Sequence, residues 1–96
     1  MVTLDTVKHI LKEHKSVLFN KYPLKSMAIF GSISRGEETE TSDVDILVEF
    51  NGKIGIRFID LADEIEEYLK TKVDLVSKNG MKEKYFRSVE NDLVYV

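Results

Sequence analysis

The spacing of apolar residues divides the chain into alternating helical and extended segments. Near the N-terminus, apolar positions recur at steps of three and four residues, which predicts an amphipathic helix over residues 3–20. Two apolar runs follow, SMAIFG at 26–31 and VDILVEF at 44–50, and each predicts a strand. The second run is apolar almost throughout its centre, as expected for a strand that is covered on both faces.

The second half of the chain continues this alternation. Apolar residues form one stripe between residues 55 and 70, which predicts a helix, and KVDLVS at 72–77 predicts a third strand. Residues 81–91 are expected to be helical, and LVYV at 93–96 is expected to form a short last strand. The order of the elements therefore predicts an α/β or α+β fold in which helices cover a small mixed sheet.

Composition narrows the class of protein. With 96 residues, 43% of them hydrophobic and 32% charged, the chain is predicted to form a single globular domain over residues 1–96. The absence of cysteine excludes disulfides and thiolate metal sites. No apolar run reaches the length of about 20 residues that a membrane helix needs, so a cytoplasmic location without membrane contact is expected. The net charge of −3 argues against a general nucleic-acid binder, and no direct DNA binding is expected.

Asp43 and Asp45 stand two positions apart at the start of the second strand, where like charges repel each other. Side chains two apart in a strand lie on one face, and Asp74 interrupts the third strand in a similar apolar setting. If the second and third strands are neighbours, the three carboxylates share one face of the sheet and suit a hard cation such as Mg²⁺. An ordinary role for Asp43 as a cap or loop-end residue is the alternative.

Gly31 and Ser32 end the first strand, and glycine at this point permits a tight turn and the close approach of a ligand. Backbone N–H groups at the start of a following helix bind phosphate, and the Ser32 hydroxyl can add a hydrogen bond. Arg35 is within reach of either a phosphate or a neighbouring glutamate, and both interpretations stay open. An ordinary turn is the simpler interpretation of Gly31 and Ser32 alone. However, ten residues separate Ser32 from Asp43, so two neighbouring strand ends can bring the motifs together.

In combination, these features resemble the pattern of the DNA polymerase β-like nucleotidyltransferase superfamily. That pattern is Gly-Ser, about ten residues, and then Asp-x-Asp followed by apolar residues, and Asp74 in KVDLV matches its third carboxylate. GSISRGEETETSDVDILVEF and the ending KVDLVSKNGMKEKYFRSVENDLVYV resemble the minimal nucleotidyltransferases (MNT), which are commonly antitoxins paired with a HEPN-domain ribonuclease toxin. The resemblance covers about residues 20–96 and implies the nucleotidyltransferase fold.

The resemblance also implies an activity, the Mg²⁺-dependent transfer of a nucleoside monophosphate from a nucleoside triphosphate. It assigns triphosphate binding to Gly31 and Ser32, and Arg35 is added to these cofactor-binding candidates because of its place in the same turn. Asp43 and Asp45 would bind the two Mg²⁺ ions, and Asp74 would complete the second metal site and help to deprotonate the acceptor hydroxyl. In the antitoxin branch, the resemblance implies that AMP is transferred from ATP to a tyrosine of the toxin, which blocks its ribonuclease site.

The length of the chain bears on the acceptor. Larger relatives in the superfamily carry an additional domain that grips the acceptor, and residues 1–96 leave no room for one. A macromolecular acceptor that brings its own surface is therefore expected, in a hetero-oligomer with the toxin. Two alternatives stay open: a non-catalytic nucleotide-binding antitoxin that neutralises the toxin by binding it, and transfer to a small molecule or an RNA end.

The remaining conspicuous side chains receive structural interpretations. Tyr85 and Phe86 are expected to lie in the core, with a partner-facing role as the alternative. Glu37, Glu38 and Glu40 are expected to form a solvated loop. Four basic residues after the third strand are interpreted as a solvated helix face, with contact to the triphosphate or a partner as the alternative: Lys78, Lys82, Lys84 and Arg87.

Overall fold

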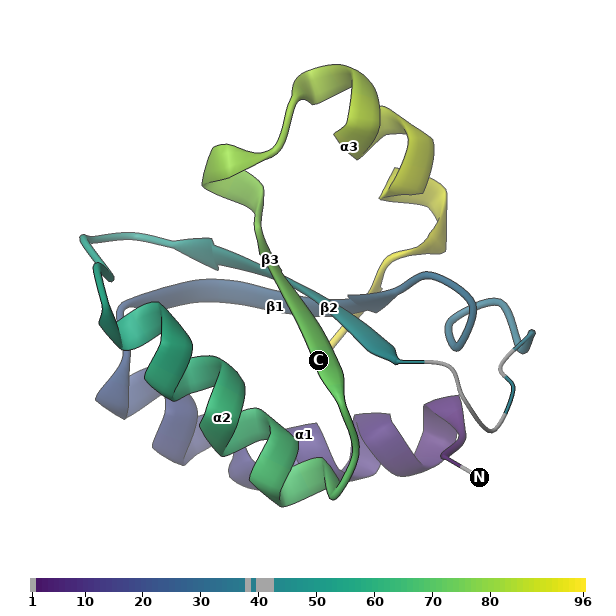
Figure 1. Cartoon of the computed structure of the whole chain (residues 1–96), viewed down its shortest axis with the longest axis horizontal. Coiled ribbons are helices and arrows are strands. Elements are labelled where there is room, and N and C mark those ends of the chain that lie inside the picture. The colour runs from purple at the N-terminus through teal and green to yellow at the C-terminus, as the bar shows by residue number, and fades with distance from the viewer. Residues whose placement is uncertain (1, 38, 40–42) are drawn as a thin grey trace.

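The computed structural model describes residues 2–37, 39 and 43–96 of the chain. In this part, three α-helices and four strands follow one another in the predicted order, and two 3-10 helices, η1 and η2, flank the last α-helix (Figure 1). None of the described helices is both long enough and apolar enough to cross a membrane. The bounds are α1 Leu4–Lys21, β1 Leu24–Phe30, β2 Val44–Phe50, α2 Arg57–Leu69, β3 Val73–Ser77, η1 Lys78–Gly80, α3 Glu83–Val89, η2 Glu90–Asp92 and β4 Val94–Tyr95.

The four described strands form one mixed sheet in the order β3-β2-β1-β4. β1 is antiparallel to both of its neighbours, β2 and β4, whereas β2 and β3 are parallel. Figure 1 shows α1 and α2 together on one side of the sheet and α3 on the other. Right-handed crossovers place the helices in this way. The connection from β2 through α2 to β3 runs toward one edge of the sheet, whereas the connection from β3 through α3 to β4 runs back to the opposite edge. The two helices therefore cover opposite faces of the sheet. The predicted small mixed sheet covered by helices is confirmed.

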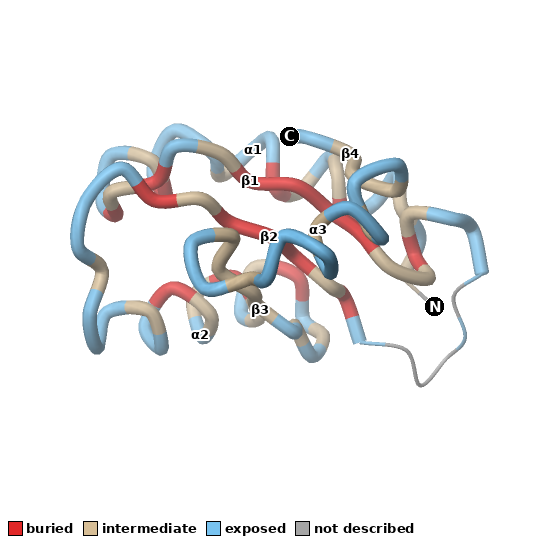
Figure 2. Tube along the Cα trace, turned by 90° about the horizontal axis from the view of Figure 1, so that it is seen from above, coloured by how far each residue is buried: buried red, intermediate tan, exposed pale blue. Residues whose placement is uncertain are grey.

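The main hydrophobic core lies between the sheet and the layer formed by α1 and α2. Alternate residues of β2 face these helices, and Val44, Ile46 and Val48 are buried there in one cluster with Leu11 of α1 and Leu61 of α2. Figure 2 shows that buried positions run along the two central strands. Each fully buried aliphatic side chain stabilises the fold by about 1.5–3 kcal/mol, so these contacts hold β2 firmly against the two helices.

The opposite face of β2 carries a different set of side chains. Asp45, Leu47 and Glu49 alternate with the core residues and therefore point toward the side of α3. Leu47 is buried beside its partner Ala28 on β1, so the centre of β2 is covered on both faces as predicted. Asp45 lies on this second face at the beginning of the strand and is partly exposed.

A group of polar side chains around Glu64 fastens α2 to the end of α1. The Glu64 carboxylate accepts hydrogen bonds from Lys21 Nζ at 3.0 Å and from the hydroxyls of Tyr22 and Tyr68 at 2.9 and 2.5 Å. Burial favours the neutral carboxyl, but these donors outweigh burial and lower the pKa of Glu64. Burial and then the hydrogen bond to Glu64 raise the pKa of Tyr22 to about 12. The His14 ring stacks on Tyr68 with centroids 3.8 Å apart.

α3 differs from the prediction. It covers Glu83–Val89 rather than 81–91, and none of its residues is buried. The prediction that Tyr85 lies in the core is wrong, because 51% of this residue is exposed. Phe86 is half-buried and lies beneath the Lys78 ammonium, which is 4.7 Å from the ring centroid. A helix of about two turns presents only a narrow face to the sheet, and that face does not include Tyr85.

Candidate active site

Gly31 follows β1 directly and places its backbone against the side chain of Asp45. In the antiparallel ladder Phe30 pairs with Asp45, so Gly31 lies beside the start of β2. Gly31 has a φ angle of +79°, and a Cβ atom added there would lie 2.1 Å from Oδ2 of Asp45. Both the backbone conformation and the available space therefore require glycine at this position.

The Gly31 turn, defined here as residues 31–36, is compact and is anchored in the core by Ile33, which is 2% exposed. The Ser34 hydroxyl donates to the Gly31 carbonyl at 2.8 Å. The chain forms tight turns here instead of the helix start considered from the sequence, with backbone hydrogen bonds from Ser34 to Gly31, from Arg35 to Ser32 and from Gly36 to Ile33. Within the described ranges, no backbone carbonyl accepts from the N–H groups of Ser32 and Ile33, which makes them candidate phosphate donors.

Two of the three aspartates lie side by side on neighbouring strands, and the third lies two residues away along the chain. Asp45 and Asp74 are register partners in the parallel pair of β2 and β3, so their side chains project from the same face. Asp43 is exposed and immediately precedes β2. Burial raises the pKa of Asp45, the charges of Asp74 and then Asp43 raise it further, and Arg35 opposes this increase. Asp74, Asp43 and Arg35 therefore all lie close enough to act on the Asp45 carboxyl.

The chemistry of the three aspartates, Asp43, Asp45 and Asp74, fits a hard divalent cation. No three carboxylate or imidazole side chains of the described residues are already grouped closely enough to hold a metal ion. However, the ionised form of Asp45 is disfavoured by burial and by two further carboxylates, Asp74 and Asp43. A cation with oxygen ligands would offset both effects. The electrostatics of the site therefore favour cation binding on the face that carries Asp45 and Asp74.

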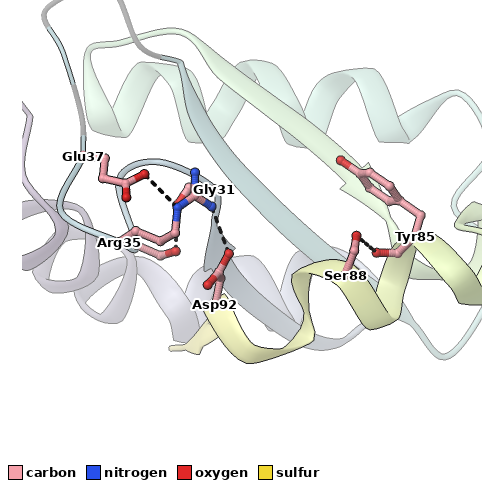
Figure 3. Close-up of polar contacts among 7 residues, drawn as sticks. Gly31, Arg35, Glu37, Tyr85, Ser88 and Asp92 are labelled. Carbon is pink, nitrogen blue, oxygen red and sulfur yellow. Dashed lines mark hydrogen bonds and ion pairs between the residues drawn. The ribbon is translucent and has the colours of Figure 1, made fainter.

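Arg35 is held between two carboxylates at the side of the Gly31 turn (Figure 3). Its Nε donates to Oε1 of Glu37 and its Nη1 donates to Oδ2 of Asp92, both at 2.9 Å. These hydrogen bonds, first that of Glu37 and then that of Asp92, raise the pKa of Arg35. The predicted alternative of a neighbouring glutamate is confirmed. The contact with Asp92 was not predicted, and no local spacing indicates it because the two residues are 57 positions apart.

The structure also places the other charged residues considered from the sequence. Glu37 is exposed apart from its contact with Arg35, whereas Glu38 and Glu40 lie outside the described residues. Two of the four basic residues after β3 pair with nearby carboxylates, Lys78 with Glu49 at 3.8 Å and Arg87 with Glu83 at 2.8 Å, and the other two are exposed, Lys82 and Lys84. These positions agree with a solvated helix face.

Comparison with known proteins shows the family of the chain. The sequence profile of the nucleotidyltransferase domain family matches residues 8–96. A Methanocaldococcus jannaschii protein that bears the name protein adenylyltransferase is 48% identical over 98 residues, and the match covers 100% of both chains. Protein adenylyltransferase MntA of Thermococcus cleftensis is 39% identical over 97 residues, and the match covers 100% of this chain and 98% of the relative.

Two solved structures show the same fold. A structure described as a minimal nucleotidyltransferase superposes with a TM-score of 0.82 and 28% identity, covering 97% of this chain and 95% of the other. A chain of a tri-AMPylated Shewanella oneidensis HEPN toxin in complex with MNT antitoxin superposes with a TM-score of 0.69 and 22% identity, covering 93% and 70% of the two chains. The predicted nucleotidyltransferase fold is confirmed. The protein belongs to the nucleotidyltransferase domain family and is a nucleotidyltransferase of the minimal type, related to protein adenylyltransferases.

Proposed function

We propose that the protein transfers AMP from ATP to a tyrosine of a cognate HEPN-domain ribonuclease toxin, with Mg²⁺ as cofactor, and thereby neutralises the toxin. In this proposal residues 1–96 act as one catalytic domain in the cytoplasm. The observation that carries the proposal is the close approach of Gly31 to Asp45, whose register partner is Asp74. The relative named protein adenylyltransferase MntA supports AMP transfer to a protein. The fold shared with a complex of MNT antitoxin and AMPylated HEPN toxin supports the class of acceptor.

In the proposed reaction, the acceptor hydroxyl oxygen attacks the α-phosphorus of ATP. A new P–O bond forms to the tyrosine, the bond to the β-phosphate breaks, and pyrophosphate leaves with the electron pair. The carboxylate of Asp74 accepts the hydroxyl proton. Asp43, Asp45 and Asp74 would hold two Mg²⁺ ions, which when bound stabilise charge on the attacking and leaving oxygens.

The Gly31 turn binds and orients the triphosphate in this proposal. The Ser32 hydroxyl and the backbone N–H groups of Ser32 and Ile33 donate hydrogen bonds to phosphate oxygens. The guanidinium of Arg35, on the same turn, supplies positive charge to the phosphates. Gly31 itself contributes by having no side chain, since its backbone then approaches Asp45 closely enough for the triphosphate and the carboxylates to share one site.

A label-transfer experiment tests the proposal. The protein is incubated with MgATP labelled at the α-phosphate and with the proposed partner, a HEPN-domain protein. We expect the wild type to label the HEPN protein with a mass increase of one or more AMP units. We expect the double variant Asp43→Asn, Asp45→Asn to lose at least about 100-fold in rate, because the reacting phosphate is no longer held in position. Unchanged labelling by the double variant would overturn the mechanism.

A matched control separates the site from a general effect of charge. The variant Asp60→Asn, Asp63→Asn removes two carboxylates from the exposed surface of α2, and it should label the HEPN protein at the wild-type rate. Cell survival adds a second readout. If the Asp43→Asn, Asp45→Asn variant protects cells from the toxin completely while it transfers no AMP, the alternative of neutralisation by binding replaces the proposal.

A further inference from the structure

Asp92 reaches the Gly31 turn from the far end of the sequence. It is the last residue of η2, and β4 begins two positions later at Val94. β4 pairs with β1 through Val94 and Ile29, and β1 leads directly into the Gly31 turn. Asp92 and the turn are therefore carried by two hydrogen-bonded antiparallel strands at the same end of the sheet, which fixes the distance between them.

The contact between Asp92 and Arg35 immobilises the guanidinium. Nη1 is bound by Asp92 while Nε is bound by Glu37, so two sides of the planar group are held at once (Figure 3). The side chains of Arg35 and Asp92 are 42% and 27% exposed, which leaves part of the guanidinium open to a ligand. A free arginine side chain has many rotamers, and most of this freedom is lost whenever it binds an anion. Here that freedom is already restricted before any anion arrives.

The immobilised guanidinium lies within the electrostatic field of the aspartate site. The charge of Arg35 acts on Asp45 and favours its ionised form, against the influence of Asp74 and Asp43. Arg35 also belongs to the same turn as Gly31, whose backbone lies against the Asp45 carboxylate. A polyphosphate seated on the Gly31 turn would therefore lie beside this guanidinium.

We propose that Asp92 is a positioning residue for the nucleotide site: it holds the guanidinium of Arg35 beside the Gly31 turn in readiness for the phosphates of ATP. This inference rests on the proposed function. Asp92 acts through Arg35 and does not itself contact the nucleotide. The segment formed by η2 and β4 is then part of the nucleotide site as well as the edge of the sheet.

A plain surface ion pair would behave differently. Half-exposed pairs of this kind contribute little to folding, so a structural contact between η2 and the turn would show a small change in melting temperature and no change in nucleotide affinity. Loss of a positioning contact weakens the affinity for ATP, because without Asp92 the Arg35 side chain must be ordered at the moment of binding. A structural role and a positioning role are therefore distinguished by comparing the change in melting temperature with the change in affinity for ATP.

The test compares three variants with the wild type. Asp92→Asn removes the charge at nearly constant shape, Asp92→Glu keeps the charge, and Glu83→Gln is the matched control. Glu83 also pairs with an arginine, Arg87 at 2.8 Å, in the same C-terminal part of the chain. Affinity is measured by calorimetry, with magnesium and an ATP analogue in which a methylene group joins the α- and β-phosphorus atoms and prevents transfer. The KM values for ATP and for the HEPN protein are measured separately.

We expect Asp92→Asn to weaken binding of the analogue about three- to tenfold and to raise the KM for ATP by a similar factor. The KM for the HEPN protein should stay the same, Asp92→Glu should recover most of the affinity, and Glu83→Gln should match the wild type. In an Arg35→Ala background, Asp92→Asn should have no further effect on affinity. Wild-type affinity in Asp92→Asn, or an equal loss in both backgrounds, would overturn the inference.

The outcome is separable from that of the proposed function. If the wild type binds the analogue and Asp92→Asn weakens that binding, the positioning role stands even when no transfer to the HEPN protein is detected. If the wild type transfers AMP and Asp92→Asn behaves like it in both affinity and KM, the proposed function stands and the positioning role fails.

Discussion

Replacing Gly31 by alanine should slow AMP transfer about 100-fold while leaving the fold largely intact. The new Cβ atom would lie 2.1 Å from Oδ2 of Asp45, about 1.3 Å closer than ordinary contact at 3.4 Å, and 3.3 Å from the Asp45 Cβ. The backbone of Gly31 is fixed by β1 and by the turn, so the carboxylate of Asp45 must rotate away. A misplacement of about 1 Å in a reacting group can cost about 100-fold in rate.

Gly36→Ala is the matched control for this prediction. Gly36 has a φ angle of +71°, and a Cβ atom there would meet no atom within 4 Å. Both alanines must therefore adopt a left-handed conformation, at a cost of about 1–2 kcal/mol, which is partly offset by the lower entropy of the unfolded chain. Only the alanine at position 31 displaces Asp45. The two variants should thus have similar stability and very different activity.

The assay measures AMP transfer to the HEPN protein and urea denaturation for both variants. We expect Gly31→Ala to transfer AMP about 100-fold more slowly than Gly36→Ala, with unfolding free energies that agree within about 1 kcal/mol. If Gly31→Ala retains more than roughly a third of the rate of Gly36→Ala, the contact between Gly31 and Asp45 does not position the Asp45 carboxylate for the reaction. Equal and severe unfolding of both variants would show instead that backbone strain dominates.

Three further predictions concern stability and are measured by urea denaturation without divalent ions. Asp45→Asn should stabilise the protein at pH 7–8, because burial and then Asp74 raise the pKa of Asp45 and its charge opposes folding. The gain should vanish below about pH 3, where the wild-type carboxyl is protonated in both the folded and the unfolded state. Glu64→Gln should destabilise the protein by about 1–2 kcal/mol at neutral pH. Its deficit should shrink as the pH falls through the lowered pKa of Glu64, and a deficit independent of pH would contradict the assignment. Tyr85→Ala should change the unfolding free energy by less than about 0.5 kcal/mol, since this residue is exposed, and a loss above 2 kcal/mol would place Tyr85 in the core after all.

The local elements could be predicted because they depend on residues that are close in sequence. The predicted strand at 44–50 agrees with β2, and the predicted helices at 3–20 and 55–70 agree with α1 and α2 within a few residues. Apolar periodicity carries this information directly. The prediction for α3 failed in part, because seven residues between two 3-10 helices are too few for periodicity to show which side chains meet the sheet.

The sequence alone identified the candidate residues of the site: a glycine and a serine after one buried strand, two aspartates at the start of the next, and a third aspartate inside an apolar strand. Only the tertiary structure decided how they meet. The strand order makes Asp45 and Asp74 partners, and the register with β1 sets the Gly31 backbone against Asp45. The crossover through α3 brings Asp92 to Arg35. Such contacts depend on which strands pair and over which face the connections pass, and these are properties of the whole packed chain that no local spacing encodes.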